Sequence, residues 1–350
     1  MIPYIIVLII TLANCLINTR LSNNFVFIIL FLFSACRYDV GYDYASYMDI
    51  MWRNDDFQLD RMELIERYLL YLSINLKFYQ LFFIVNSAVV FFCVKRFVQK
   101  NSINVAISYL VFLCMPLMLT QSYSIVRHWS ALAVILYAST FLFEKKYITY
   151  GALCLLSVGF HNVGYIGFLL LPMVIFNLNL KWNIIILIIS FFAGELLKVW
   201  LNDTLSGVDL YISNKFINYL ENEEGESGLS RIPYVFLFFD IIYLFALNYN
   251  HEVGSKIWSI ATIYNIGCCL MFLFKAQVTL SLRFSTPFIA FIIVLFPHFL
   301  VKPLLNNKWM AIKYLTAIIL LCGLFIITIS IYNGSIHRSQ YLPYRTFLSK

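Results

Sequence analysis

The chain has 350 residues, of which 61% are hydrophobic and only 12% are charged, and its formal net charge is +7. This composition excludes a soluble protein and indicates an integral membrane protein. The positive charge does not indicate nucleic-acid binding, because the basic residues gather at the ends of apolar runs, where they orient helices in a membrane. The eight cysteines lie inside or at the edges of these runs, and their spacing fits neither a zinc site nor a disulfide framework.

Apolar runs of about 17 to 22 residues, separated by short polar turns, predict transmembrane α-helices, and their lack of alternation excludes a β-barrel. We therefore expect an all-α, polytopic integral membrane protein that forms a single transmembrane domain over residues 1–350. The first run lacks a basic n-region and a cleavage site, so it is expected to be retained as a helix. About twelve helices are predicted, over residues 2–19, 22–36, 78–94, 103–120, 126–143, 147–160, 164–180, 183–200, 232–249, 257–274, 284–301 and 310–332.

Two long polar segments, residues 37–66 and 201–231, interrupt the helices, and a polar tail follows at 333–350. The short turns that alternate with them are rich in lysine, and by the positive-inside rule they face the cytoplasm. The two long segments and the tail then face the opposite side, as do the turns at 120–127 and 275–283. The sequence thus predicts two long periplasmic loops, a periplasmic tail and a functional surface outside the cytoplasm.

On this predicted topology, arginine and lysine residues gather on opposite sides of the membrane. Arg20 and Arg96 are the arginines on the inner side, where lysine supplies most of the anchoring charge. A planar guanidinium is suited to forked recognition of phosphate or carboxylate, so the bias predicts an outward-facing anion site. The outward arginines are Arg37, Arg53, Arg61, Arg67, Arg127, Arg231, Arg283, Arg338 and Arg345.

The first polar segment opens with RYDVGYDYASYMD, residues 37–49. Asp39 and Asp43 are four residues apart. Tyr44 and Tyr47 are three apart, so each pair shares a face if the segment is helical. Tyrosine rings stack on sugars, and carboxylates bind sugar hydroxyls or take a proton from one. The two aspartates could instead hold a divalent cation against a phosphate, and an interfacial aromatic belt is the simplest alternative.

Three further positions on the predicted outward side are candidate site residues. Arg127, with His128 beside it, opens one helix, and Arg283 opens another next to serine and threonine side chains. His161 lies in a turn between two apolar segments of about 17 residues, near 25 Å each, which is short of a full crossing. That turn must lie below the outer surface, so we expect His161 on the floor of a cavity. A packed histidine bonded to a carbonyl is the alternative.

The tail repeats the arginine and tyrosine chemistry of the first polar segment, in Arg338, Tyr341, Tyr344 and Arg345. A frayed terminus is the alternative interpretation. The sequence contains no P-loop, no HExxH, no GxSxG and no dinucleotide fingerprint, so ATP-driven work is not expected.

Several of these segments resemble the EpsG-like branch of the Wzy-type O-antigen and exopolysaccharide polymerases. They are RYDVGYDYASY followed by Glu66, then SIVRHWSALAVIL, GFHNVGYIGFLLLP and SLRFSTPF, with a tyrosine-rich outward tail. The resemblance covers most of the chain and implies a GT-C-like glycosyltransferase acting on the periplasmic face of the bacterial inner membrane. Such an enzyme would transfer the growing glycan from undecaprenyl pyrophosphate to the non-reducing end of an incoming lipid-linked repeat unit.

Carried over by motif, the resemblance implies a catalytic set and a substrate-binding set, with no metal ion and no cofactor. The catalytic set is Arg37, Asp43, Arg127, His161 and Arg283. The substrate-binding set is Asp39, Tyr44, Tyr47, Glu66, His128, Arg338, Tyr341, Tyr344 and Arg345, with His128 standing where the family often has Gln. The implied partners are the undecaprenyl-pyrophosphate-linked oligosaccharide, membrane lipid and a chain-length-determining membrane protein, without nucleic acid.

The chemistry of the residues agrees with this family. Arg127 and Arg283 would stabilise the charge of the departing lipid pyrophosphate, and either His161 or Asp43 would take the proton of the attacking hydroxyl. Two alternatives stay open. A flippase for the same lipid-linked unit would share the helices but needs a central path rather than two long segments on one side. A membrane O-acyltransferase could use His161 as its base, but the cytoplasmic side shows no constellation of His and Arg to receive an acyl donor.

Overall fold

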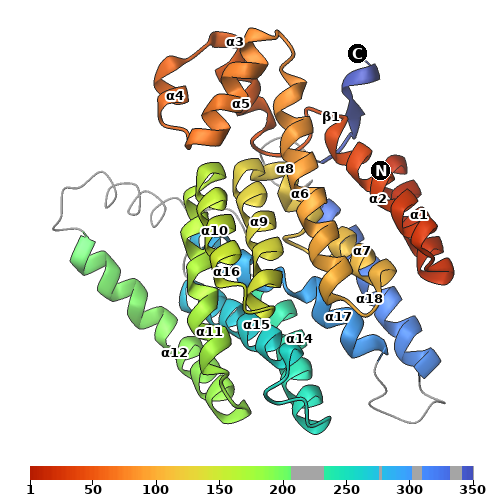
Figure 1. The fold of residues 1–350 in the computed structure, drawn as a ribbon, viewed down its shortest axis with the longest axis vertical. Coiled ribbons are helices and arrows are strands. Elements are labelled where there is room, and N and C mark those ends of the chain that lie inside the picture. The colour runs from red at the N-terminus through yellow and green to blue at the C-terminus, as the bar shows by residue number, and fades with distance from the viewer. Residues whose placement is uncertain (206–231, 276–277, 302–309, 332–340, 350) are drawn as a thin grey trace. The chain divides into compact units, whose positions relative to one another are not determined.

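The computed structural model confirms the all-α class, since the regular structure of the residues that it describes is helical apart from one short strand pair (Figure 1). The described residues are 1–205, 232–275, 278–301, 310–331 and 341–349. The chain divides into two compact units, of which unit 1 comprises Met1–Leu169 with Phe296–Lys350, and unit 2 comprises Leu170–Leu295.

Five helices among the described residues are long and apolar enough to cross a membrane, and α16 (Val278–Ile289) with α17 (Ile292–Val301), bent by 50°, would make a sixth. The five lie at Gln80–Asn101, Val126–Phe143, Ile232–Tyr249, Lys256–Leu273 and Ile312–Ser330. The other predicted spans form apolar helices of 10–17 residues. The membrane character of the chain is therefore evident, whereas the expected number of twelve crossings is not shown.

Proline accounts for part of this shortening. A residue that precedes proline is driven out of the helical region, and Met115, which precedes Pro116, is extended at ψ 138°. The run predicted as one helix over residues 103–120 is consequently divided into α7 (Val105–Cys114) and the short α8 (Leu119–Ser124). Pro287 inside α16 likewise removes a backbone donor three residues before the bend that separates α16 from α17.

The other helices of unit 1 that correspond to predicted runs are α1 (Ile2–Ile17), α2 (Arg20–Ala35), α6 (Gln80–Asn101), α9 (Val126–Phe143), α10 (Tyr147–Phe160), the 3-10 helix η1 (Asn162–Leu169) and α18 (Met310–Ile331). Most of them follow the predicted runs to within a few residues, but α6 ends at residue 101 instead of 94, and the run predicted over 164–180 is divided into η1 and α11 (Leu170–Phe176).

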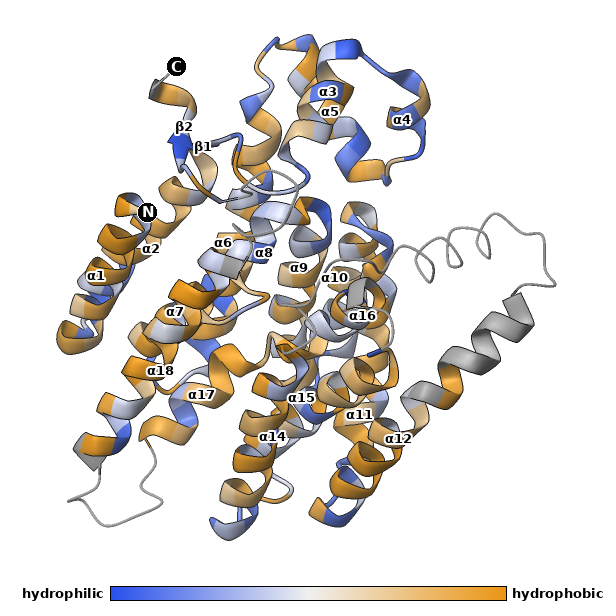
Figure 2. Cartoon of the chain, turned by 180° about the vertical axis from the view of Figure 1, so that it is seen from behind, coloured by the Kyte–Doolittle hydropathy of each residue, from blue (hydrophilic) through white to orange (hydrophobic). Residues whose placement is uncertain are grey.

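The first polar segment is folded rather than extended as a loop. It contains α3 (Tyr44–Arg53), α4 (Asp56–Asp60) and the start of α5 (Leu64–Asn75). Asp55 caps α4 by accepting a hydrogen bond from the Gln58 N–H at 3.1 Å. Figure 1 shows these three helices together at one end of unit 1, and in Figure 2 hydrophilic colour dominates around α4 while α1 is mostly hydrophobic.

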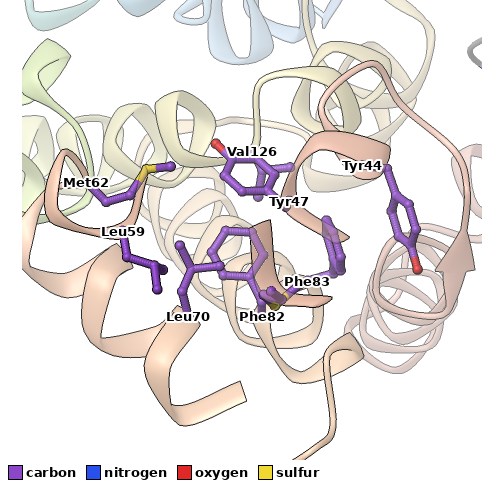
Figure 3. Packing of buried hydrophobic residues seen from close by; sticks show 9 residues of the cluster. Tyr44, Tyr47, Leu59, Met62, Leu70, Phe82, Phe83 and Val126 are labelled. Carbon is purple, nitrogen blue, oxygen red and sulfur yellow. The ribbon is translucent and has the colours of Figure 1, made fainter. Parts of the chain in front are cut away.

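An aromatic core holds α3 and α5 against α6. The Tyr44 ring stacks on Phe83 with centroids 4.2 Å apart, and Tyr47 packs on Phe82 at 4.8 Å (Figure 3). The cluster is completed by Met51, Leu59, Met62, Leu70 and Val126. Burial of large aromatic rings supplies most of the favourable free energy of such packing. The polar segment thus has a hydrophobic core of its own that fixes α3.

The C-terminal residues return to the first polar segment. β1 (Arg37–Tyr38) and β2 (Arg345–Thr346) pair antiparallel, with Arg37 opposite Thr346. Tyr344 stacks on Phe33 at 4.2 Å, and its hydroxyl donates to the Phe33 carbonyl at 2.6 Å. Residues 341–349 are therefore packed rather than frayed, while the other residues of the predicted tail, 333–340 and 350, lie outside the described residues.

The two ends of α9 carry different charged groups. Arg127 lies in the first turn of α9. Glu144, directly after its last residue, pairs with Lys100 at 2.9 Å and with Lys146 at 2.7 Å. At 1.5 Å per residue, the 18 residues of α9 separate these groups by about 27 Å. Unit 1 thus has one end rich in arginine and tyrosine and another rich in lysine.

Unit 2 is a bundle of apolar helices around α15. Besides α16, the described residues of this unit form α11 (Leu170–Phe176), α12 (Leu180–Leu205), α14 (Ile232–Tyr249) and α15 (Lys256–Leu273). Asp240 on α14 is fully buried and accepts a hydrogen bond from the Asn265 amide of α15 at 2.7 Å. This intramembrane acid therefore joins two helices. The second predicted loop, 201–231, lies outside the described residues from residue 206 onward.

Gly41 marks the point where the first polar segment touches α8. Its φ is +99°, and an added Cβ would overlap the Tyr123 carbonyl oxygen. The neighbouring Asp43 N–H donates to the Ser124 carbonyl at 3.2 Å, which fixes the approach. We expect Gly41→Ala to lower the thermal unfolding midpoint of the purified protein in detergent by several degrees, because the substitution adds both strain and overlap.

Gly151→Ala is the matched control, since a Cβ at Gly151 in α10 would meet nothing within 4 Å. Alanine is also the better helix former, so the midpoint should stay equal or rise. A Gly41→Ala protein as stable as the parent would contradict the observed contact with Tyr123.

Candidate functional site

A partly exposed arginine at the start of α9 forms the centre of the candidate site. The Arg127 Nε donates to the Tyr47 hydroxyl at 2.7 Å, and its Nη1 forms an ion pair with Glu63 Oε2. The Arg127 and Glu63 side chains are 21% and 11% exposed. Tyr47 belongs to α3, and Glu63 is the N-cap residue of α5. Two elements of the first polar segment thus fix the arginine in a direction that keeps part of it open to solvent.

Glu63 also binds the turn after α10. Its second oxygen, Oε1, accepts a hydrogen bond from the Asn162 backbone N–H at 3.2 Å. The preceding residue, His161, is the C-cap of α10, and its ring lies 5.4 Å from the ring of His128, with an interplanar angle of 63°. Hydrogen bonds and ring contacts therefore link four of the predicted site residues, Tyr47, Arg127, His128 and His161, through Glu63 and the turn after α10.

The ring of His161 has a defined hydrogen-bonding direction. The Val163 N–H donates to His161 Nδ1 at 3.0 Å, so Nδ1 carries no proton. A neutral imidazole then carries its proton on Nε2. In this arrangement Nε2 is a hydrogen-bond donor, and the lone pair that a general base needs is already occupied at Nδ1.

Glu66 lies one turn after Glu63 but is buried completely. Its Oε2 accepts a hydrogen bond from the Asn86 amide at 3.1 Å, and the Asn86 carbonyl oxygen accepts one from the Ser130 hydroxyl. Burial raises the pKa of Glu66 to about 8, although the Asn86 hydrogen bond and the nearby Arg127 charge lower it. At neutral pH this carboxyl is therefore largely protonated, and it adds little negative charge beside Arg127.

Asp43 precedes α3 and is half-buried. The Asp43 carbonyl accepts a hydrogen bond at 3.1 Å from the backbone N–H of Tyr47, the residue whose hydroxyl holds Arg127. Burial raises the pKa of that Tyr47 hydroxyl, while the Arg127 charge lowers it and the Asp43 charge raises it. Asp39 has a left-handed backbone with φ +53° and lines a separate groove together with Tyr44. The hydroxyl of Tyr44 donates to Gln80 at 2.9 Å.

Arg37 is not part of the open cluster, because it is only 1% exposed. Its Nη1 donates to the Ser34 carbonyl at 2.6 Å and to the Ser87 hydroxyl at 3.2 Å. The guanidinium also lies over the rings of Tyr123 and Phe83, at 4.8 and 5.4 Å from their centroids. Burial lowers the pKa of Arg37. The described residues surround this cation with aromatic faces and neutral oxygens rather than with a carboxylate.

The other predicted site residues are spread over the fold. Tyr341 is buried and hydrogen-bonds the Ser124 hydroxyl at 2.8 Å. Tyr344 packs on Phe33, and Arg345 is exposed in β2. Arg283 is exposed on α16 of unit 2. Arg338 lies outside the described residues.

Two members of the cluster were missed by the sequence analysis, Glu63 and Asn86. Glu63 stands three residues before Glu66, a spacing that places both carboxyls on one side of a helix start, and this pattern was the available signal. Asn86 lies inside an apolar run, where a lone amide does not indicate its partner. In the part of the chain that the structure describes, no three His, Cys, Asp or Glu side chains gather in a way that could hold a metal ion.

A family model for the EpsG family matches residues 20–346, which is nearly the whole chain. The chain belongs to the EpsG family. Membership of the EpsG family, together with the apolar helices, indicates a membrane protein with a polymerase-like role in polysaccharide biosynthesis. The comparison with curated proteins and the comparison with solved structures found no match.

The raised pKa of Glu66 predicts how the stability of this EpsG-family protein changes with pH. Below the ordinary pKa of 4.5 the Glu66 carboxyl is protonated in both folded and unfolded chains, so its ionisation does not change the free energy of unfolding. Between about 4.5 and 8 only the unfolded chain releases the proton, so stability falls as pH rises through this window, by at most on the order of 5 kcal/mol. Glu66→Gln should flatten this fall.

The measurement is the thermal unfolding midpoint of the purified protein in detergent at about pH 5, 7 and 9, across the window set by this pKa shift. Asp56→Asn, at an exposed position of α4, is the control and should keep the pH dependence of the parent. If Glu66→Gln and the parent lose the same number of degrees between these pH values, the buried carboxyl does not titrate as argued.

Proposed function

We propose that this chain is the polymerase that joins repeat units of an O-antigen or related surface polysaccharide on the periplasmic face of the bacterial inner membrane. The observation that carries the proposal is the Arg127 cluster, in which a carboxylate and a phenol fix a partly exposed guanidinium beside the His161 turn. A fixed, positively charged donor suits a pyrophosphate group. Membership of the EpsG family supports a polysaccharide as the product.

The donor would be a growing glycan linked to undecaprenyl pyrophosphate. In the reaction, the bond between the anomeric carbon and the pyrophosphate oxygen breaks, and the leaving lipid pyrophosphate keeps the electron pair. Arg127 would stabilise that charge, since donors placed in advance lose little free energy to reorganisation. Nε and Nη1 are held by Tyr47 and Glu63, and the second terminal nitrogen, Nη2, remains for the ligand among the residues described.

The acceptor is a hydroxyl at the non-reducing end of the incoming unit. Its oxygen forms the new glycosidic bond, and its proton passes to a general base. The hydrogen bond from Val163 disfavours His161 in that role, and both oxygens of Glu63 are occupied by Arg127 and Asn162. We therefore assign the base to Asp43, with Glu63 as a positioning residue and His161 as a donor that orients the substrate through Nε2.

The sidedness of unit 1 supports a periplasmic site. The Arg127 cluster and the lysine-rich Glu144 cluster lie at opposite ends of α9. Lysine-rich turns favour the cytoplasmic side of a membrane, which supports a position of Arg127 on the other side. A substrate with a lipid anchor in the bilayer and a polyhydroxylated head in water would meet the cluster at that surface.

Arg37 receives a supporting role in this proposal. A phosphate has no access to Arg37 at 1% exposure, so we propose that Arg37 supports the segment that carries Asp43. Arg283 is exposed on α16 of unit 2, and the role that the family resemblance implies for it stays a prediction. Tyr341 and Tyr344 would act by holding the tail against the first polar segment.

Deletion of the chain from its source strain should separate the proposed polymerase from the two alternatives. We expect an electrophoresis gel of the surface polysaccharide to lose its ladder while keeping a single repeat unit, because units would still be made and moved outward but not joined. Loss of every unit would instead indicate a flippase. An intact ladder that lacks only an acyl group would indicate an acyltransferase and overturn the proposal.

Arg127→Ala should reduce polymer formation at least about 100-fold, the usual cost of losing a donor to a developing negative charge. Arg127→Lys keeps the charge but not the fork, so it should also be strongly impaired. Lys100→Ala is the matched control, because it breaks an ion pair of the same unit at the far end of α9. Polymer length and amount would be measured in the deletion strain at matched protein levels, and full-length polymer from Arg127→Ala would refute the assignment.

A further inference from the structure

A groove separate from the Arg127 cluster lies along α3. Its volume is about 360 Å³, within the range of roughly 300–1,000 Å³ typical of small-molecule sites. At 100° per residue, the side chains that line it project from a different face of α3 than Tyr47, which contacts Arg127. The lining includes Tyr38, Asp39, Tyr44, Met48, Asp49 and Trp52.

The aromatic walls of the groove are held in place from behind. Tyr44 stacks on Phe83 at 4.2 Å, and its hydroxyl is fixed by Gln80, while Tyr38 meets Tyr44 edge-on at 5.7 Å. Trp52, in contrast, is 75% exposed. Leaving so large an apolar ring in solvent forfeits free energy that burial would provide, so a ligand that covers it gains that contribution.

The charges of the groove exclude one class of ligand and favour another. Asp39 and Asp49 are the charged groups in the lining, and no lysine or arginine is among the residues that line it. Asp49 pairs with Arg53 at 2.7 Å on the rim, with half of its side chain still exposed. Carboxylates repel phosphates and anionic lipids, but they accept hydrogen bonds from hydroxyl groups. Flat aromatic rings with neighbouring carboxylates match the apolar faces and hydroxyls of uncharged sugars.

We propose that the α3 groove binds interior sugars of the growing glycan, away from its lipid pyrophosphate. This inference rests on the proposed polymerase function. A polymerase must keep a long chain close to the Arg127 cluster after each transfer, and a second contact on the same chain raises its effective concentration there. The left-handed backbone of Asp39, at φ +53°, would be the local cost of aiming its carboxylate at this groove.

Binding is tested with oligosaccharides cut by mild acid from the strain's own polysaccharide, so that they carry neither lipid nor pyrophosphate. Calorimetric titration into the purified protein in nanodiscs should show binding that Trp52→Ala weakens at least tenfold and that Asp49→Asn weakens several-fold. Trp52→Phe, which keeps an aromatic face, should bind nearly as well as the parent. Trp182→Ala is the control, since Trp182 is also an exposed tryptophan, at 52%, but lies on α12.

Chain length in cells tests which glycan occupies the groove. Trp52→Ala should still polymerise but should shift the ladder to shorter chains, because a weakly held chain leaves after fewer transfers. A ladder of normal length and lower total amount would indicate that the groove holds the incoming unit, and it would overturn the assignment to the growing chain.

The two proposals fail in different ways. If Trp52→Ala binds the oligosaccharides as tightly as the parent, the groove is not a glycan site and Trp52 belongs to an interfacial aromatic belt, whatever Arg127→Ala does. If Arg127→Ala still makes full-length polymer while Trp52→Ala has lost oligosaccharide binding, the groove stands and the proposed chemistry at Arg127 falls.

Discussion

The ion pair between Arg127 and Glu63 is the interaction on which the candidate site depends. It joins the start of α9 to the start of α5, and through the other Glu63 oxygen it also holds the turn after α10. Removing two charges from water is costly, and the cost is recovered only when the remaining donors and acceptors are satisfied. Tyr47 and the Asn162 N–H provide those hydrogen bonds, so the arginine is fixed without being fully buried.

Two arginines with similar sequence surroundings therefore have different physical states. Arg37 and Arg127 both follow apolar runs and both have tyrosines nearby in the sequence. Arg37 is enclosed by ring faces and neutral oxygens, which compensate its charge and leave no path for a ligand. Arg127 has a carboxylate partner and remains at a surface. A cation that must meet a substrate needs this second arrangement.

Helix α3 connects two regions that suit different ligands, one anionic and the other uncharged. Tyr47 on one face orients the Arg127 guanidinium, which suits a phosphate, while Asp49 and Trp52 on another face suit uncharged sugars. The aromatic core beneath α3 keeps both faces in a fixed relation, because Tyr44 and Tyr47 pack on neighbouring rings of α6. A lipid-linked glycan has the same division, with a charged group at one end and neutral sugars beyond it.

The sequence by itself determined the helical class and most helix positions, because a chain in lipid must satisfy its backbone within each helix and place its charges at the ends. It did not reveal α4, it left a helix at α3 as one possibility only, and it did not show the burial of Arg37. Nor could it show that Glu63 meets Arg127 across 64 residues, or that Trp52 and Asp39 share a groove. Tertiary structure decided these, since such partners are chosen by the packing of the aromatic core and not by spacing along the chain.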